Sequence, residues 1–362
     1  MIPVNLYYIV FLYSVIALTF ISFSTVGKSY TQIRRGTSTF LFALIICAVF
    51  SWWLGQRPNG PIFGDSVYYA HDFHRMFYGY MPPDKGEWLW DGLMLFCVHT
   101  MDVSSFFTII SVGYFGFTLW ACKRLTPNNV LVTLLFCMGA FSFYSYGVNG
   151  IRNGLACSVT LVSLSYMMGN KKDKIIAGVL AFVAYNIHHT TGLPILMGVM
   201  SLFFIRSFKN AYIFWILSIL LSLVAGNAIT SLFVGLGFDD RLSYLITLDT
   251  NKFTHTGFRW DFLIYSMMPI ILGYYIVIKR GIRDRNYTFL LNTYTLANAF
   301  WVMVIRANYS NRFAYLSWFM YPIVLAYPLL KLDIWGNTQG TYLKQIMLAN
   351  VGFTWFMQTF YW

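Results

Sequence analysis

Two carboxylates with different surroundings are the first candidates for catalysis. Asp65 lies in the sequence GDSVY (residues 64–68), eleven residues beyond the end of an apolar segment. Glu87, the only glutamate of the chain, precedes a short apolar segment. A carboxylate that faces a membrane surface could accept a proton from a sugar hydroxyl, as a general base does. The alternatives are a solvated loop aspartate and a glutamate that stabilises a helix N-terminus through the helix dipole.

The sequence NGIRNGLA (residues 149–156) predicts a tight turn followed by the first turn of a helix. Arg152 and Asn153 then lie where free backbone N–H groups and a guanidinium converge, which suits a phosphate group. Gly150 and Gly154 have the spacing that lets a ligand or a neighbouring helix approach closely. The alternative is an arginine that only anchors the helix at the membrane interface.

A histidine pair, His188 and His189, separates two apolar limbs of about 15 and 14 residues. At about 1.5 Å per residue each limb extends about 21–23 Å, less than the hydrocarbon thickness of a bilayer. We therefore expect the pair to lie below the membrane surface, inside a cavity. There a histidine could act as a base or donate a hydrogen bond to substrate, or it could simply cap a helix.

Four further arginines could hold phosphate oxygens, because a guanidinium binds them in a bidentate manner and tolerates partial burial. Arg241 and Arg259 each have an aspartate nearby in the sequence with which they could pair instead. Arg306 and Arg312 have none, which makes them the better candidates. The alternative for all four is anchoring at the membrane surface.

The composition shows what kind of elements must position these residues. Hydrophobic residues make up 58% of the 362 residues and charged residues only 10%, whereas a soluble domain carries about 25% charged residues. The chain therefore needs lipid as its solvent. Lipid offers no partner for an open strand, which predicts an all-α polytopic membrane protein.

Long apolar runs predict about twelve transmembrane helices within a single integral membrane domain, residues 1–362. The predicted spans are 4–25, 38–54, 103–121, 128–148, 151–170, 174–188, 192–205, 211–234, 261–278, 287–305, 312–330 and 343–360. The segment 87–100 is too short to span and is expected to form a re-entrant or interfacial helix. Long loops are predicted at 55–102 and 233–260.

Lysine and arginine are distributed unevenly between the two alternating sets of loops. One set holds sixteen of them against three acidic residues, and the other holds nine against ten. The first set is expected to be cytoplasmic. Both termini, both long loops and all the candidate residues then lie on the outer side. The net charge of +12 thus follows from membrane topology and does not indicate nucleic-acid binding.

Taken together and in this order, several motifs resemble the EpsG family of polysaccharide polymerases, within the wider Wzy group of O-antigen and capsule polymerases. The motifs are GDxxY at 64–68, Glu87 before a short helix, IRNGLA at 151–156, HHTT at 188–191 and RFAY at 312–315. The family usually has Arg-Gln at Arg152-Asn153, so the arginine is kept. It usually has Phe-His at the histidine pair, so His189 aligns with the family histidine.

The resemblance implies a GT-C-like membrane glycosyltransferase at the outer face of the bacterial inner membrane. Such an enzyme would join undecaprenyl-diphosphate-linked oligosaccharides, and we expect no cofactor and assign no metal-binding residues. Its expected partners are these lipid-linked oligosaccharides, membrane lipids and a chain-length regulator protein. The expected catalytic residues are Asp65, Glu87 and His189. The expected diphosphate- or substrate-binding residues are Arg152, Arg306, Arg312, Arg241, Arg259, Asn153, His188 and Tyr315.

Two other classes of function remain open from the sequence. Among enzymes, the chain could be an O-antigen ligase or a transferase that uses a polyprenyl-phosphate sugar. From a different class, it could be a flippase or another transporter of lipid-linked oligosaccharides. The middles of the predicted spans carry no ionisable residue, whereas transporters place polar or charged groups there. This absence counts against transport.

Overall fold

The computed structural model describes residues 2–36, 39–81, 86–235, 257–307 and 310–361. Within these ranges every regular element is a helix, which confirms the predicted all-α class. The chain forms two compact units, residues 1–192 with 326–362 and residues 193–325. The single membrane domain over residues 1–362 stays a prediction.

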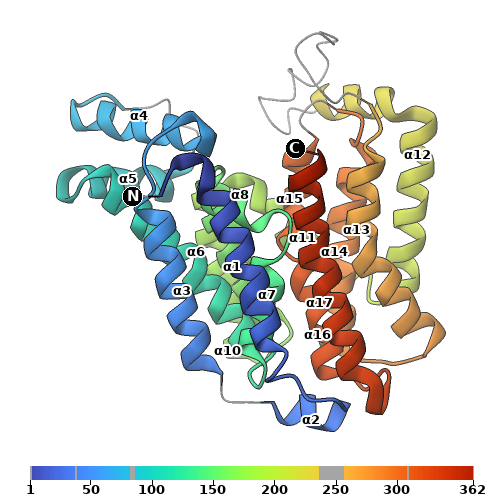
Figure 1. Cartoon of the computed structure of the whole chain (residues 1–362). Helices are drawn as coiled ribbons and strands as arrows, with labels where there is room; N and C mark the ends of the chain where they lie inside the picture. Colours follow the sequence, from blue (N-terminus) through green and yellow to red (C-terminus); the bar gives the residue numbers. More distant parts are fainter. Residues whose placement is uncertain (1, 37–38, 82–85, 236–256, 308–309, 362) are drawn as a thin grey trace. The chain divides into compact units, whose positions relative to one another are not determined.

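Unit 1 holds the N-terminal half of the chain and its last helix (Figure 1). Its helices are α1 (Tyr7–Ser22), α2 (Tyr30–Arg35), α3 (Phe40–Gly55), α4 (Ser66–Phe77), α5 (Trp88–Thr100), α6 (Val103–Leu125), α7 (Val130–Met138), α8 (Phe143–Val148), α9 (Ile151–Met167), α10 (Lys171–Ile187) and α17 (Gln339–Phe356). Unit 2 contains α11 (Gly192–Phe203), α12 (Phe208–Gly235), α13 (Trp260–Gly273), α14 (Arg285–Met303), α15 (Asn311–Trp318) and the first part of α16 (Tyr321–Lys331), whose residues from 326 onward belong to unit 1.

Five helical stretches of the described residues are long and apolar enough to cross a membrane: Val4–Ser22, Val103–Leu125, Phe208–Gly226, Trp260–Lys279 and Asn311–Lys331. Two shorter apolar helices are Phe40–Gly55 and His189–Phe203. The protein is therefore a membrane protein. The count of twelve spans and the GT-C-like arrangement stay predictions.

The structure divides or extends several of the predicted helices. The predicted span 128–148 is two helices, α7 and α8, separated at residues 139–142. The short helix predicted at 87–100 is present as α5. The predicted loop 55–102 also contains α4, which buries Ser66, Ala70, Phe73 and Met76 along one face. Its apolar residues are too few and too interrupted to form a continuous apolar run, so the search for such runs missed it.

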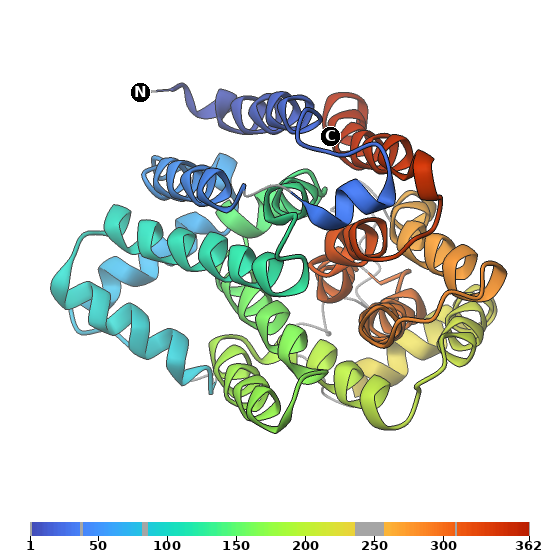
Figure 2. The ribbon, with the colours of Figure 1, turned by 90° about the horizontal axis from the view of Figure 1, so that it is seen from below.

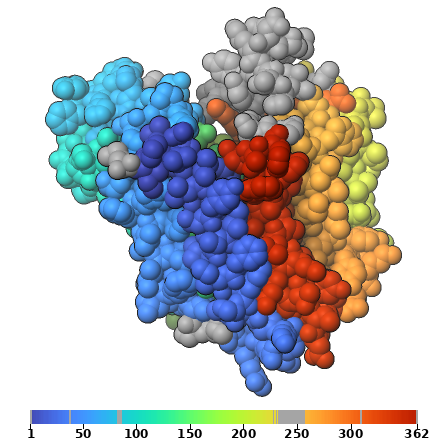
Figure 3. Space-filling view, in the orientation of Figure 1, coloured from blue at the N-terminus to red at the C-terminus, as the bar shows by residue number. Residues whose placement is uncertain are grey.

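Helix α9 forms the centre of unit 1 and is buried along most of its length. It packs against α6, α8 and α10, and Figure 2 shows the unit from below. Helices α1 and α17 lie side by side on the face shown in Figure 3, where Trp355 Nε1 donates a hydrogen bond to Tyr13 Oη at 3.3 Å. Both chain ends accordingly lie at the same end of unit 1 (Figure 1).

The opposite end of unit 1, which contains α2, is rich in lysine and arginine. Hydrogen bonds to backbone carbonyls hold its segments together. The backbone N–H of Gly340 donates to the Lys28 carbonyl at 2.8 Å, and Tyr30 Oη donates to the Lys331 carbonyl at 3.0 Å. Helices α4 and α5 lie at the other end, away from α2 (Figure 1). The cytoplasmic side predicted for the basic loops stays a prediction.

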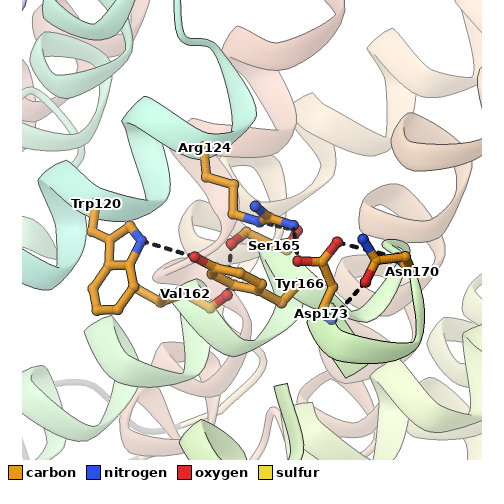
Figure 4. Close-up of polar contacts among 7 residues, drawn as sticks. All are labelled: Trp120, Arg124, Val162, Ser165, Tyr166, Asn170 and Asp173. Atoms are coloured by element: carbon orange, nitrogen blue, oxygen red, sulfur yellow. Dashed lines mark hydrogen bonds and ion pairs between the residues drawn. The ribbon is translucent and has the colours of Figure 1, made fainter. Parts of the chain in front are cut away.

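At the basic end, Arg124 ties α6 to the turn between α9 and α10 (Figure 4). Its Nη2 lies 2.9 Å from Asp173 Oδ1, its Nε donates to the Ser165 carbonyl at 3.2 Å, and its guanidinium lies over the Tyr166 ring. Asp173 also forms a reciprocal capping box with Asn170 at the start of α10. Asp173 therefore caps the N-terminus of α10 and anchors α6 through Arg124.

We expect Gly169→Ala to lower the free energy of unfolding by about 1–2 kcal/mol, the cost of losing a helix cap. A Cβ at Gly169 would lie 2.1 Å from Asp173 Oδ2, so Asp173 must leave its capping position. The measurement is the unfolding temperature in detergent micelles. Gly178→Ala, in open space on α10, is the matched control and should be neutral or stabilising. Equal behaviour of the two variants would contradict the prediction.

Candidate functional site

Glu87 precedes the first residue of α5, but its carboxylate does not cap that helix. The side chain turns instead toward α9 and α10. Its Oε2 lies 2.5 Å from Arg152 Nη1. Its Oε1 lies 2.5 Å from His188 Nδ1 and accepts a hydrogen bond from the His189 backbone N–H at 3.2 Å. Helix capping, one of the alternatives for Glu87, is therefore wrong.

Arg152 is the second residue of α9, directly after a turn that ends at Gly150. Its side chain is only 12% exposed, and its buried Nε has no hydrogen-bond acceptor among the described residues. A guanidinium has five N–H donors, and an orphaned buried donor is costly. An anionic ligand beside Arg152 would remove that cost. The Asn153 side chain is engaged within α9, where its Oδ1 accepts a hydrogen bond from Cys157 Sγ, one turn further along the helix, at 3.2 Å.

The two histidines have different roles in the geometry. His188 ends α10 with an extended backbone, and a 3₁₀ turn, His189–Thr191, leads into α11. The imidazole of His188 contacts Glu87, whereas the imidazole of His189 stacks on Tyr185 with ring centroids 4.5 Å apart. The imidazole in contact with Glu87 is therefore that of His188, although the family alignment favours His189. A catalytic role for the His189 ring stays a prediction.

Gly86 allows this close approach of α5 to the histidine turn. Its φ of +74° lies in the region that favours glycine. A Cβ at this position would also lie 3.0 Å from His189 Cε1. Both the backbone conformation and the lack of space therefore require glycine before Glu87.

The buried Glu87 carboxylate is ionised because of its partners. Burial raises the pKa of this group, but the hydrogen bond and charge of His188, the charge of Arg152 and the His189 backbone N–H together lower the pKa to about 2. The ordinary value is 4.5. A carboxylate with so low a pKa is a weak proton acceptor at neutral pH.

We expect Glu87→Gln to change how stability depends on pH. Since folding lowers the pKa of Glu87, its contribution is complete above pH 4.5 and is lost as the pH falls toward 2. The depression corresponds to about 3 kcal/mol. Wild type should therefore lose about that much more unfolding free energy than Glu87→Gln between pH 4.5 and 2. The measurement is unfolding in detergent micelles over this range, and parallel curves for the two proteins would contradict it.

Asp65 is tied to the same turn as Arg152 through its backbone. Its N–H donates to Asn149 Oδ1 at 2.7 Å, and Asn149 directly precedes Gly150. Gly64, with φ +61°, leaves room for this contact, since a Cβ there would lie 2.4 Å from Asn149 Oδ1. The carboxylate of Asp65 is half-buried and forms no ion pair within the described part of the chain.

Four motifs from residues 64–191 are thus assembled in unit 1 around one buried glutamate, in the order that the sequence resemblance requires. The EpsG family matches the chain over residues 41–359. This protein belongs to the EpsG family. Its members are Wzy-type polysaccharide polymerase-like membrane proteins. No curated protein and no solved structure matches the chain.

The remaining candidates of this EpsG-family protein lie in unit 2 or outside the described residues. Arg259 binds Asp261 through two hydrogen bonds of 2.9 and 2.6 Å, so the pairing alternative is correct for it. Arg306 donates to the Leu223 carbonyl at 3.3 Å, and its buried Nε has no acceptor within the described ranges. Arg312 is exposed at the start of α15. Arg241 lies outside the described residues.

Within unit 2, Arg306 approaches the segment that carries Arg259. Its guanidinium carbon lies 5.9 Å from the centroid of the Phe258 ring. Tyr315 packs its ring against Trp318, with centroids 5.5 Å apart. A gathering of the unit 2 arginines around the Glu87 cluster stays a prediction.

The sequence analysis did not single out two residues that shape this site in the EpsG-family protein, Gly86 and Tyr185. Gly86 lies in a segment without a periodic pattern that would have marked it. Tyr185 lies near the end of α10, four residues before His189, but His189 belongs to the 3₁₀ turn beyond the helix, so helical spacing does not mark this pair.

Proposed function

We propose that this EpsG-family protein is a polymerase that joins undecaprenyl-diphosphate-linked oligosaccharide repeat units by glycosyl transfer. The growing glycan is the donor, and the non-reducing end of a new repeat unit is the acceptor. The acceptor oxygen forms a bond to the anomeric carbon, and the bond from that carbon to the diphosphate oxygen breaks. The diphosphate leaves with the electron pair, and a base takes the acceptor proton.

The observation that carries the proposal is the Glu87 carboxylate held between Arg152 and His188. This arrangement supports a site that combines an anion-binding group with a proton acceptor. Arg152 neutralises the charge that develops on the leaving diphosphate, and its orphaned Nε supplies a donor for a phosphate oxygen. Charge stabilisation of this kind is usually the largest single contribution to catalysis.

The proposal assigns Glu87 to orientation rather than to proton transfer, because its pKa of about 2 makes it a weak base. Glu87 accepts a hydrogen bond from His188 Nδ1, which selects the tautomer whose other ring nitrogen can accept a proton. His188 is then the base, and the carboxylate stabilises the imidazolium that forms. Asp65, anchored beside the Arg152 turn, is the alternative base.

The other predicted residues complete the proposal in supporting roles. Arg306 and Arg312 bind diphosphate, Arg241 and Arg259 add positive charge, and Asn153 and Tyr315 contact the substrate, whereas His189 contributes its backbone N–H to Glu87. The reaction occurs at the outer face of the bacterial inner membrane, with both termini on the periplasmic side. The lipid carrier remains in the bilayer, and a chain-length regulator is the predicted protein partner.

The test is chain extension by the purified protein in proteoliposomes. The substrate is the lipid-linked repeat unit extracted from a polymerase-deficient strain of the source bacterium. The expected product is a ladder of oligomers on the lipid carrier. Transfer of the glycan to a different lipid would indicate a ligase, addition of one sugar a monosaccharide transferase, and movement across the bilayer without bond formation a transporter. Each of these three results would overturn the proposal.

A further inference from the structure

Arg57 is a buried cation for which the sequence analysis found no role. It lies two residues beyond α3 and is 2% exposed. Its Nη1 donates to the Leu54 carbonyl at 2.8 Å. Its Nη2 donates to Ser66 Oγ at 2.8 Å and to the Val148 carbonyl at 3.2 Å. Its guanidinium carbon also lies 4.5 Å from the centroid of the Phe107 ring.

No carboxylate of the described residues forms an ion pair with Arg57. Burial lowers the pKa of Arg57 to about 10, and electrostatic interactions with Tyr144 and Tyr7 offset part of this effect. The side chain therefore remains charged at neutral pH. A buried charge without an ionic partner is costly, so only a strong structural requirement explains its retention. Arg57 donates hydrogen bonds to acceptors on three separate segments. Holding these segments together is that structural requirement.

These three segments meet at the turn that leads to Arg152. Arg57 holds the end of α3 and the start of α4 to Val148, the last residue of α8. Ser66 Oγ also donates to the Val148 carbonyl. The next residue, Asn149, accepts the Asp65 N–H described above. Residues 148–150 are thus held from several sides immediately before α9, of which Arg152 is the second residue.

We propose that Arg57 is a positioning residue, which holds the turn 148–150 so that the Arg152 guanidinium lies against Glu87. This inference rests on the proposed function only where it concerns catalysis. The planar guanidinium reaches acceptors on different sides at once, whereas a lysine ammonium is a point charge on a flexible stem. The role is therefore specific to arginine and not to positive charge.

The first part of the test measures the turn directly and needs no activity. Hydrogen exchange of the backbone amides in 148–154 should be at least about tenfold faster in Arg57→Met than in wild type, because their local opening is no longer restrained. Exchange at the start of α10, at the basic end, should be unchanged. Arg75→Met is the matched control, since Arg75 also lies over an aromatic ring, that of Tyr80, but is only half-buried. Unchanged exchange at 148–154, or equal acceleration throughout unit 1, would overturn the proposal.

The second part measures catalysis. In Arg57→Met, kcat should fall about 10²-fold, as expected when a catalytic group moves by about 1 Å, while KM changes by less than about threefold. Arg57→Lys should restore less than a tenth of the lost activity. In an Arg152→Lys background, the further loss caused by Arg57→Met should be much smaller than in wild type, because the two residues act together. If Arg57→Met causes the same fold loss of kcat in the Arg152→Lys background as in wild type, the proposal is overturned.

The proposal stays testable if the Arg57→Met variant does not fold and also if wild type shows no polymerase activity. If Arg57→Met does not fold, Ser66→Ala removes one of the contacts to Val148 and should accelerate exchange at 148–154 in the same direction, by about threefold. No acceleration in that variant would overturn the inference. If wild type forms no polymer, the proposed function fails, whereas the exchange measurement still decides whether Arg57 holds the turn.

Discussion

Arg152→Ala is expected to reduce chain extension about 10²–10³-fold, the typical cost of removing one donor that stabilises developing negative charge. The variant loses the guanidinium nearest the proposed diphosphate position. It also leaves the buried Glu87 with His188 and the His189 N–H as its remaining partners. The measurement is the rate of ladder formation on the lipid carrier in proteoliposomes.

Two variants control for this result. Arg152→Lys keeps the charge but cannot form bidentate contacts, so it should retain part of the activity. Arg75→Ala removes an arginine from α4 that lies outside the cluster, and it should behave as wild type. Wild-type laddering by Arg152→Ala would exclude Arg152 from the diphosphate site.

His188→Gln is expected to reduce the rate about 10²–10⁴-fold, the range over which a general base contributes, whereas His189→Gln should stay within about fivefold of wild type. The reason is the contact that each residue makes with Glu87. His188 uses its imidazole, which glutamine lacks, and His189 uses its backbone N–H, which glutamine retains. Chain extension by the two variants in parallel is the measurement.

Asp65→Asn distinguishes the two candidate bases in the same assay. If His188 is the base, Asp65→Asn should retain at least about a tenth of the wild-type rate, since it keeps the backbone contact to Asn149. If Asp65→Asn loses activity while His188→Gln retains it, Asp65 and not His188 is the base.

Local sequence patterns were sufficient for the helical class and for most helix positions. Apolar runs identify helices such as α6 and α12, because a lipid-exposed helix needs apolar residues along its whole length. The same criterion missed α4, which buries only one face, and the break between α7 and α8. Both features depend on what packs against the chain and not on its average hydrophobicity.

The chemistry of the site could be predicted only as a set of candidates. The lone Glu87, the arginine turn and the histidine pair were recognisable from residue type and position. The sequence alone could not show whether Glu87 caps a helix or pairs with other side chains. It also could not show whether the ring of His188 or that of His189 contacts Glu87. A difference of one residue at the end of α10 determines which imidazole turns toward α5, and that depends on the 3₁₀ turn and on the space left by Gly86.

The sequence by itself determined that this protein is a helical membrane protein of the EpsG family, because hydrophobicity and motif order are properties of the linear chain. Only the tertiary structure decided that Glu87 contacts both Arg152 and His188, through an ion pair with the arginine and a hydrogen bond with the histidine. It alone also showed that Arg57 holds the turn beside them. These contacts join residues up to about a hundred positions apart. Their geometry follows from the packing of α5 on α10 and of α9 between α6 and α10, which no local pattern records.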